Sequence, residues 1–331
     1  MKKYSLAIVG ATGLVGRKVI EVIQEYGLPL SKCEFFATRK SAGTDFFFEG
    51  ERRIVRELKN DSFDEGFDFA IFSAGAEASK FFAPIAVSKG CIVIDNSSAF
   101  RMDKDVPLVV PEVNPEEIEN NNGIIANPNC STIQAVLPLK ALDDKYGIKR
   151  VIYSTYQAVS GAGQEGINDL ERGIRGEKPT KFPYPIVNNC LPQIDTFLDN
   201  GYTKEEEKMI NETRKILKKP NLRITATTVR VPVLNSHSES INVEFEKKFD
   251  LKELKDVLKK APGVIVEDNP DQGIYPLAIN ATGHDESFVG RIRRDFSVDS
   301  GINFWCVSDN VRKGAASNAV QILQKLIENR G

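Results

Sequence analysis

The sequence is short of the residues from which metal sites and disulfide frameworks are built. It holds two histidines and five cysteines in 331 residues, and the cysteines are scattered, odd in number and without a CxxC pair. Transition-metal sites need clustered Cys and His, so we expect no metal. This cysteine usage is typical of reduced thiols rather than of a secreted disulfide scaffold, and we expect a cytoplasmic protein.

Long apolar runs and an excess of one charge are also missing. No stretch approaches the roughly 20 apolar residues of a membrane span, and the net charge is −2. A nearly neutral chain gives no electrostatic reason to expect nucleic acid or a membrane as partner. The hydrophobic content of 41% and charged content of 27% are ordinary for a globular protein. The length suits one large or two moderate domains.

A strand, a glycine-rich turn and a helix open the chain. The apolar run Tyr4–Val9 predicts a buried strand, and apolar spacing from Val15 to Ile23 predicts a helix. This is the context of a dinucleotide-phosphate loop, because glycines allow the tight turn and the helix N-terminus meets the pyrophosphate. The spacing is GxxGxxG rather than GxGxxG, so the placement is the stronger signal, and a structural tight turn is the alternative. The predicted cofactor contacts are Gly10, Thr12, Gly13, Leu14, Val15 and Gly16.

Basic residues follow the second predicted strand, Glu34–Ala37. In this fold the end of that strand faces the adenosine ribose, where an acidic residue binds a 2′-OH and basic residues accommodate a 2′-phosphate. Arg39, Lys40 and Ser41 occupy the place, with no Asp or Glu. We therefore expect NADP as the cofactor; a solvated loop with two basic residues is the alternative.

Further strands are expected at Phe69–Phe72 and Cys91–Ile94, each followed by small polar residues. Ligands bind at the carboxyl ends of strands in open parallel sheets. Arg101 lies just past the second of these strands and is an anion-binding candidate. A surface arginine is the alternative.

A cysteine stands where a helix is expected to begin. Asn129 is a good N-cap residue. Pro128 restrains the residue before it toward extended backbone, which blocks an earlier start of the helix. Cys130 therefore lies at or just inside a helix N-terminus, where free N–H groups and the helix dipole favour a thiolate. A thiolate there is a candidate nucleophile; a small buried thiol is the alternative.

After Tyr146-Gly147 the predicted strands become longer and more antiparallel in character: Val151–Tyr156, Arg223–Arg230 and Ile241–Phe245. Between the first and second of these strands lies a long polar segment, from about Gly161 to Asn221. It includes the charged run Lys204–Lys208, which by composition is a solvated helix face. Val311 to Asn329 is amphipathic and predicts a terminal helix. We expect an α/β protein. A Rossmann-type parallel-sheet domain spans residues 1–128 plus a C-terminal helix at about 311–331, and an α+β domain with a largely antiparallel sheet spans 129–310.

Seven short motifs, in order, give the chain a resemblance over nearly its whole length. They begin at Gly10, Lys40, Asn127, Thr155, Asn211, Arg230 and Gly290, and read GATGLVG, KSAG, NPNCST, TYQAVSG, NETRKIL, RVPVLNSHSE and GRIR. Each is weak alone, but together the chain resembles the bacterial aspartate-β-semialdehyde dehydrogenases. The resemblance implies NADPH-dependent reduction of aspartyl-β-phosphate to the semialdehyde with release of phosphate, and a homodimer built on the sheet of the second domain.

The resemblance also implies roles for individual residues. Cys130 matches the acyl-forming cysteine and His237 the acid/base, in the loop after a strand that ends near Arg230. Arg230 matches the group that binds the α-carboxylate, and Gln157 the residue that orients the substrate. We place Asn129 with the catalytic residues. The remaining implied contacts are phosphate at Arg101 and Lys208, the α-amino group at Glu205, and cofactor at Ser160, Gly161 and Asn310.

The residue types suit this chemistry. Arginine captures a carboxylate in bidentate fashion, lysine is a point charge for phosphate, and histidine has a pKa range suited to proton transfer. In the cofactor loop the chain departs from the family, which more often has a single Arg beside Ser, because Arg39 precedes Lys40 here. Lys40 aligns with that arginine and is the first choice for the contact to the 2′-phosphate, with Arg39 as the alternative.

Three rival interpretations share parts of the pattern. N-acetyl-γ-glutamyl-phosphate reductase performs the same chemistry on an acylated substrate, but such a substrate has no ammonium for Glu205. A glyceraldehyde-3-phosphate-type dehydrogenase would have Ser-Cys-Thr-Thr-Asn around its cysteine. A non-catalytic dinucleotide-binding relative is disfavoured by the presence of both Cys130 and His237.

Overall fold

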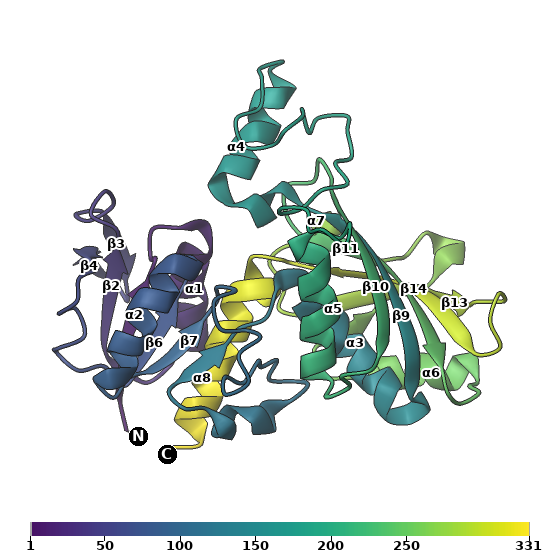
Figure 1. Ribbon diagram of the computed structural model, residues 1–331, viewed down its shortest axis with the longest axis horizontal. Coiled ribbons are helices and arrows are strands. Elements are labelled where there is room, and N and C mark those ends of the chain that lie inside the picture. The colour runs from purple at the N-terminus through teal and green to yellow at the C-terminus, as the bar shows by residue number, and fades with distance from the viewer. Residues whose placement is uncertain (1, 331) are drawn as a thin grey trace. The chain divides into compact units, whose positions relative to one another are not determined.

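The structure, a computed structural model, describes residues 2–330 and divides into two compact units. The first unit holds the chain up to Pro128 together with the part from Ala315 onward, and the second runs from Asn129 to Gly314. Each unit is built on its own six-stranded sheet, and several strands of each sheet are labelled in Figure 1.

The sheet of the first unit is parallel throughout, with strand order β5-β2-β1-β6-β7-β8. Its strands are β1 (Tyr4–Val9), β2 (Leu30–Ala37), β5 (Arg56–Glu57), β6 (Phe69–Phe72), β7 (Ile92–Asp95) and β8 (Ile124–Ala126). Its helices are α1 (Leu14–Tyr26), α2 (Ala76–Ser88), α8 (Asn318–Glu328) and a 3₁₀ turn at Pro115–Asn120; a hairpin of β3 (Asp45–Phe48) and β4 (Glu51–Ile54) adds a small second sheet.

Helices cover both faces of this sheet. Leu6 and Ile8 belong to the core cluster that includes α1 and α8, whereas Ala7 and Val9 belong to the cluster that includes α2. Successive strand residues point to opposite faces, so a strand covered on both faces reads as an uninterrupted apolar run. This is why β1 was visible in the sequence.

The second unit has a mixed sheet of order β10-β9-β11-β14-β13-β12. The central pairs are antiparallel, and only β9 with β10 and β12 with β13 run parallel. Its strands are β9 (Ile148–Gln157), β10 (Arg223–Arg230), β11 (His237–Phe245), β12 (Val264–Val266), β13 (Ser287–Arg294) and β14 (Gly301–Ser308). Its helices are α3 (Cys130–Tyr146), α4 (Gly163–Ile174), α5 (Lys204–Ile216), α6 (Leu251–Lys259) and α7 (Ala278–Ala281), with 3₁₀ turns at Val159–Ala162 and Pro270–Gln272. The predicted fold class, a parallel-sheet domain plus a largely antiparallel one, is confirmed.

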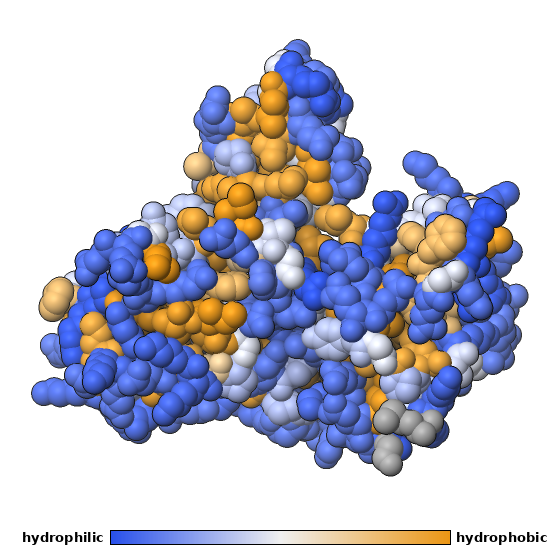
Figure 2. All heavy atoms as spheres, turned by 180° about the vertical axis from the view of Figure 1, so that it is seen from behind, coloured by the Kyte–Doolittle hydropathy of each residue, from blue (hydrophilic) through white to orange (hydrophobic). Residues whose placement is uncertain are grey.

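One face of the second sheet lies under α3, α5 and α6. Alternate residues of β11, from His237 to Phe245, are buried there. The other face carries exposed aromatic and aliphatic side chains, among them Tyr156, whose ring lies 5.4 Å from that of Trp305. In Figure 2 further apolar atoms gather on the projecting segment that holds α4, where Ile174 and Tyr184 are exposed.

Two elements differ from the sequence-based expectation. His237 is the first residue of β11 and not part of a loop, because the left-handed backbone of Ser236 (φ +69°) turns the chain immediately before it. The C-terminal segment is not one regular helix from about 311: residues Arg312–Ser317 are π-helical and α8 begins at Asn318. This wider turn brings Gly314 against Cys130, so close that a Cβ on the glycine would lie 2.8 Å from the cysteine Cβ.

Within residues 2–330 no helix combines the length and the apolar character that crossing a membrane requires. The same residues contain no group of three or more His, Cys, Asp or Glu side chains arranged to hold a metal ion.

Candidate active site

The nucleophile candidate lies at a capped helix N-terminus. Cys130 is the first residue of α3, and the side-chain oxygen of Asn129 accepts the N–H groups of Ser131 at 3.0 Å and Thr132 at 3.4 Å. The sulfur is thus held at the positive end of a 17-residue helix, where negative charge is stabilised. Cys130 is half-buried, whereas Cys33, Cys91 and Cys306 are buried. Burial raises the pKa of the Cys91 thiol to about 12 and that of Cys306 well above its ordinary value.

Two hydrogen bonds orient the imidazole of His237. Its Nε2 lies 3.3 Å from Sγ of Cys130, and its Nδ1 accepts the backbone N–H of Ala158 at 3.0 Å. A nitrogen that accepts an N–H bears no proton, so the neutral ring carries its proton on Nε2, facing the sulfur. The ring is fully buried, and this burial together with the nearby charge of Arg230 lowers its pKa well below the ordinary value. His237 is therefore neutral, and it donates toward Cys130.

Arg230, the last residue of β10, is buried beside this pair. Its Nη1 donates to the carbonyl oxygen of Ala158 at 2.6 Å. Burial lowers its pKa, and the charges of Glu205 and Cys130 oppose that effect. Gly161 packs over both side chains: a Cβ there would lie 2.7 Å from Nη1 of Arg230 and 3.2 Å from Nε2 of His237. The space above the site therefore requires a glycine at this position. The backbone of Ala158 holds both side chains, because its carbonyl accepts from the guanidinium and its N–H donates to the imidazole.

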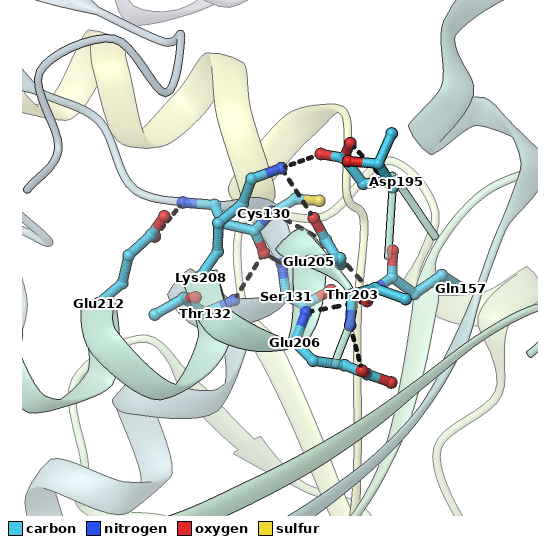
Figure 3. A network of polar contacts seen from close by, with 12 residues as sticks. Cys130, Ser131, Thr132, Gln157, Asp195, Thr203, Glu205, Glu206, Lys208 and Glu212 are labelled. Carbon is cyan, nitrogen blue, oxygen red and sulfur yellow. Dashed lines mark hydrogen bonds and ion pairs between the residues drawn. The ribbon is translucent and has the colours of Figure 1, made fainter. Parts of the chain in front are cut away.

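A buried carboxylate joins the cysteine's helix to the sheet. Glu205 is 4% exposed, and its Oε1 accepts from Asn129 Nδ2 at 3.0 Å and from Gln157 Nε2 at 3.2 Å. Its Oε2 accepts from Lys208 Nζ at 3.3 Å. Figure 3 shows this network together with Glu212, whose Oε2 accepts the backbone N–H of Asn129 at 2.7 Å.

The charged run Lys204–Lys208 is the first part of α5, and it is not a simple solvated face. Thr203 and Glu206 form a reciprocal capping box at its start, which fixes the helix N-terminus in place. With the start fixed, Glu205 points inward and Lys208 follows one turn later on the same side. The structure thus brings together Asn129, Cys130, Gln157, Glu205, Lys208, Arg230 and His237.

The register of the second sheet explains how distant segments meet at this site. Arg230 pairs with Gln157, and Ser238 pairs with Tyr156 in the antiparallel direction, which sets His237 opposite Gln157. The next row on the same face holds Thr228, Thr155, Glu239 and Cys306, all buried. A polar row thus lies directly beneath the row that holds Arg230, Gln157 and His237.

The other predicted contacts of the second unit also cluster. Ser160 and Asn310 are buried and hydrogen-bonded to each other, with Nδ2 to Oγ at 3.0 Å. The Oδ1 of Asn310 accepts the N–H of Ser236 at 2.9 Å, next to His237. Ser160 precedes Gly161, which packs over the imidazole of His237. Ser160 and Asn310 therefore both lie next to that ring.

In the first unit the glycine turn has the form that a dinucleotide phosphate requires. Gly10 has φ +84°, and a Cβ there would lie 2.5 Å from the carbonyl oxygen of Ser73. A Cβ on Gly16 would lie 2.2 Å from the oxygen of Gly10, so turn and helix are in direct backbone contact. Gly13 caps α1 without a side-chain hydrogen bond, which leaves the first N–H groups of the helix available to an anion. Thr12, Leu14 and Val15 complete this turn and the first helical residues.

The basic residues of the first unit are placed differently from one another. Arg39 and Lys40 are exposed just after β2, and within residues 2–330 neither side chain forms a hydrogen bond or an ion pair; Ser41 is half-buried. Arg101 is 8% exposed, and its guanidinium donates to the backbone oxygens of Asn127 at 2.9 Å and Asn96 at 2.8 Å. Arg101 is thus fixed at the carboxyl edge of the sheet, while Arg39 and Lys40 remain open to a ligand.

Sequence reasoning missed three acidic residues around this site. Asp195 contacts Lys208 with its Oδ2 2.9 Å from Nζ, Glu212 binds the backbone of Asn129, and Glu239 lies beneath His237. Only Glu239 had a signal, since it alternates with His237 on a strand. Asp195 and Glu212 reach the site through loop and helix geometry that no local pattern shows.

Two family models match the chain. The model described as semialdehyde dehydrogenase, NAD binding domain, matches residues 5–121, and the model described as semialdehyde dehydrogenase, dimerisation domain, matches residues 139–313. Together with the glycine turn and the Cys130–His237 pair, they define an oxidoreductase of the semialdehyde dehydrogenase class that uses a nicotinamide dinucleotide.

Individual relatives narrow the class. The aspartate-semialdehyde dehydrogenase of Aquifex aeolicus is 52% identical over 334 residues, which cover 98% of each chain. The crystal structure of aspartate semialdehyde dehydrogenase II complexed with ASA, from Vibrio cholerae, has a TM-score of 0.95 at 44% identity over 99% of both chains. That of the Candida albicans enzyme with NADP has a TM-score of 0.78 at 25% identity over 98% of both. The chain belongs to the aspartate-semialdehyde dehydrogenase family, which confirms the resemblance read from its motifs.

Proposed function

We propose that the chain reduces L-aspartyl-4-phosphate to L-aspartate-4-semialdehyde and phosphate with NADPH, in the biosynthesis of lysine, threonine, methionine and diaminopimelate. The observation that supports this most directly is the 3.3 Å contact between Sγ of Cys130 and Nε2 of His237 at a helix N-terminus. The site beside it offers a carboxylate, Glu205, and cations, Arg230 and Lys208, which suit a zwitterionic phosphorylated substrate.

Substrate binding follows from the charges. Arg230 pairs with the α-carboxylate and Glu205 with the α-ammonium, while Lys208 and Arg101 contact the phosphate. Gln157, which already donates to Glu205, orients the substrate. The carboxylate at Glu205 favours this substrate over an N-acetylated one, which has no ammonium, and so disfavours N-acetyl-γ-glutamyl-phosphate reductase activity.

The thiolate of Cys130 then attacks the acyl carbon. A C–S bond forms, the C–O bond to phosphate breaks, and phosphate leaves with both electrons of that bond. Asn129 contributes by capping α3: its side-chain oxygen accepts the N–H groups of Ser131 and Thr132, which holds the start of the helix, and with it Cys130, in place.

The bound nicotinamide supplies the hydride that reduces the thioester carbonyl. The resulting thiohemiacetal oxyanion lies beside His237, whose Nε2–H stabilises it by donation. Collapse of the oxyanion breaks the C–S bond, releases the aldehyde and restores the thiolate. The resemblance implied a proton-transferring histidine, but the acceptor role of Nδ1 favours a neutral donor throughout, and no step of this scheme needs an imidazolium.

The glycine turn fits the pyrophosphate of the cofactor, and we propose Gly10, Thr12, Gly13, Leu14, Val15 and Gly16 as its contacts. Ser160, Gly161 and Asn310 are further cofactor contacts. Arg39, Lys40 and Ser41 select NADP, since the loop has two exposed cations and no carboxylate. The Candida albicans structure with NADP supports the same cofactor.

We propose a homodimer that covers the outward face of the second sheet. Tyr156 and Leu277 are exposed there and line one hollow with Tyr275, Arg291 and Trp305. The matching family model is described as a dimerisation domain. Analytical ultracentrifugation checks this, with a sedimentation coefficient that corresponds to twice 36.7 kDa.

The test of the proposed function is phosphate-dependent reduction of NADP⁺ by aspartate semialdehyde. We expect activity in the native protein and none in Cys130→Ala, with folding intact. Cys190→Ala is the matched control, because Cys190 is the exposed cysteine, and it should retain full activity. An active Cys130→Ala variant would exclude the thioester route, and an inactive native protein would exclude the proposed substrate.

A further inference from the structure

The ammonium of Lys208 is shared between two carboxylates. Its Nζ lies 2.9 Å from Oδ2 of Asp195 and 3.3 Å from Oε2 of Glu205, as Figure 3 shows. Its side chain is 25% exposed, against 34% for Asp195 and 6% for Glu205. The shorter contact is therefore to the residue for which neither the sequence nor the proposed reaction provides a role.

Asp195 is held in place by the chain on either side of it. Its backbone is left-handed (φ +69°), a conformation that among non-glycine residues Asp and Asn tolerate best, and its Oδ1 accepts the N–H of Thr196 at 2.8 Å. Upstream, Leu191 exchanges both backbone hydrogen bonds with Arg230; downstream, the oxygen of Thr196 accepts the N–H of Lys204 at 2.9 Å. The carboxylate is thus fixed between the end of β10 and the start of α5.

Burial alone would raise the pKa of Asp195, but the hydrogen bond and charge of Lys208 lower it below the ordinary value. The pair is therefore ionised. Both side chains of this ion pair are also partly exposed, so Lys208 is able to change its contacts when a ligand binds.

Both carboxylate oxygens of Glu205 already accept hydrogen bonds. Oε1 accepts from Asn129 and Gln157, and Oε2 accepts from Lys208. A substrate ammonium that binds Glu205 must share Oε2 with a second cation, and two adjacent cations repel. Lys208 therefore has to shift away from Glu205 when the substrate binds, yet remain close enough to meet the phosphate.

We propose that Asp195 is the positioning residue that takes over Lys208 when the substrate ammonium occupies Glu205. Anchored by Asp195, the lysine leaves Oε2 to the ammonium and turns its charge to the phosphate. The proposal deepens the proposed function and rests on it. It explains how one carboxylate serves both an internal lysine and an incoming ammonium, and it makes the exchange specific for substrates that carry an α-amino group.

Asp195→Asn tests this, because asparagine tolerates the left-handed backbone and removes only the charge. Without Asp195, Lys208 stays on Glu205 and competes with the substrate ammonium. We expect KM for aspartate semialdehyde to rise about tenfold, the size of one charge-assisted hydrogen bond, and KM for phosphate to rise as well. The kcat should change little, since Asp195 touches neither Cys130 nor His237.

Two comparisons separate positioning from a structural role. With 4-oxobutanoate, the analogue that lacks the α-amino group, the same variant should show little change in KM for the aldehyde. In a Lys208→Ala background, Asp195→Asn should have no further effect on KM for aspartate semialdehyde. Asp199→Asn removes the same charge from an exposed position on the same loop and is the matched control, expected to behave as the native protein.

Equal rises in KM for both aldehydes, an effect that persists without Lys208, or an unchanged KM in Asp195→Asn would each overturn the proposal. These results are read in a protein whose native form oxidises aspartate semialdehyde. A native protein without that activity would instead refute the proposed function itself, so the two failures are distinguishable.

Discussion

At the scale of single residues, the imidazole of His237 has its donor direction fixed by the backbone. The N–H of Ala158 occupies Nδ1, and Nε2 faces Sγ of Cys130. Forming an imidazolium would direct two N–H groups at each other, in addition to placing a charge in a buried site next to Arg230. Both effects act in the same direction, so His237 stays neutral beside the sulfur of Cys130.

This tautomer is open to direct measurement. We expect ¹⁵N NMR to show His237 as a neutral ring protonated on Nε2 throughout the range of activity, because burial and Arg230 lower its pKa. The chain has only two histidines, and exposed His284 supplies the reference signals. A proton on Nδ1, or an imidazolium at neutral pH, would contradict the assignment.

Single residues also differ in how far their positions could be predicted from the sequence. The helix start at Cys130 was predicted and is confirmed, because Asn129 and Pro128 encode it locally. The contacts of Glu205 were implied only by resemblance, since a run of charges looks the same whether solvated or buried. Asp195 was missed because its role depends on a left-handed turn that brings a loop back to β10. No spacing in the sequence reports such a contact.

At the scale of elements, we propose that the loop after β2 decides the preference between NADP and NAD. Arg39 and Lys40 are exposed there, and Ser41 adds a hydroxyl. A charge-assisted hydrogen bond contributes about 1.5–3 kcal/mol, and a tenfold preference needs about 1.4 kcal/mol. One contact to a 2′-phosphate is therefore enough to favour NADP over NAD by a factor of about ten.

We expect the double variant Arg39→Ala, Lys40→Ala to raise KM for NADP⁺ at least about tenfold while leaving KM for NAD⁺ nearly unchanged. Steady-state kinetics with both cofactors measure this. The pair Lys2→Ala, Lys3→Ala is a suitable control, because it removes the same charge from exposed positions at the opposite, amino end of the parallel strands. Equal losses with both cofactors would show that the loop is not the selector.

Helices and strands also differ in how far the local sequence predicts their bounds. β1, the glycine turn and α1 were predicted because their pattern is local and continuous. The start of β11 was placed too late, since the sequence does not show that Ser236 turns the chain or that Ser238 pairs with Tyr156. The π-helical turn before α8 was missed for a similar reason: it depends on Gly314 passing Cys130 at close range, a contact between segments far apart in the sequence.

At the scale of the whole molecule, the second unit contains an ionisable group whose burial costs stability. Glu239 is fully buried in the row beneath the site, and neither of its oxygens has a hydrogen-bond partner among residues 2–330. Burial, and then the negative charge of Glu205, raise its pKa well above the ordinary value. The buried thiol of Cys306, its register partner on β14, adds no charge. Glu239 is therefore protonated in the folded protein.

A raised pKa makes the free energy of unfolding depend on pH. Above the ordinary glutamate pKa the unfolded chain ionises Glu239 while the folded chain keeps it protonated. The folded state then binds more protons, so stability falls as pH rises toward the folded pKa, by about 1.4 kcal/mol for each pH unit. The contribution is fully present only below the unfolded pKa, and a residue that cannot ionise escapes the loss.

We therefore expect Glu239→Gln to be more stable than the native protein at pH 8 and close to it at pH 5, with the difference growing steadily between them. Denaturant unfolding at several pH values measures this, and activity should be largely retained because glutamine imitates the neutral acid. Glu119→Gln, at an exposed position, removes the same formal charge and should show no such trend. If Glu239 were ionised in the folded protein, the glutamine variant would gain nothing as pH rises, and the charge beneath His237 would have to be included in the mechanism.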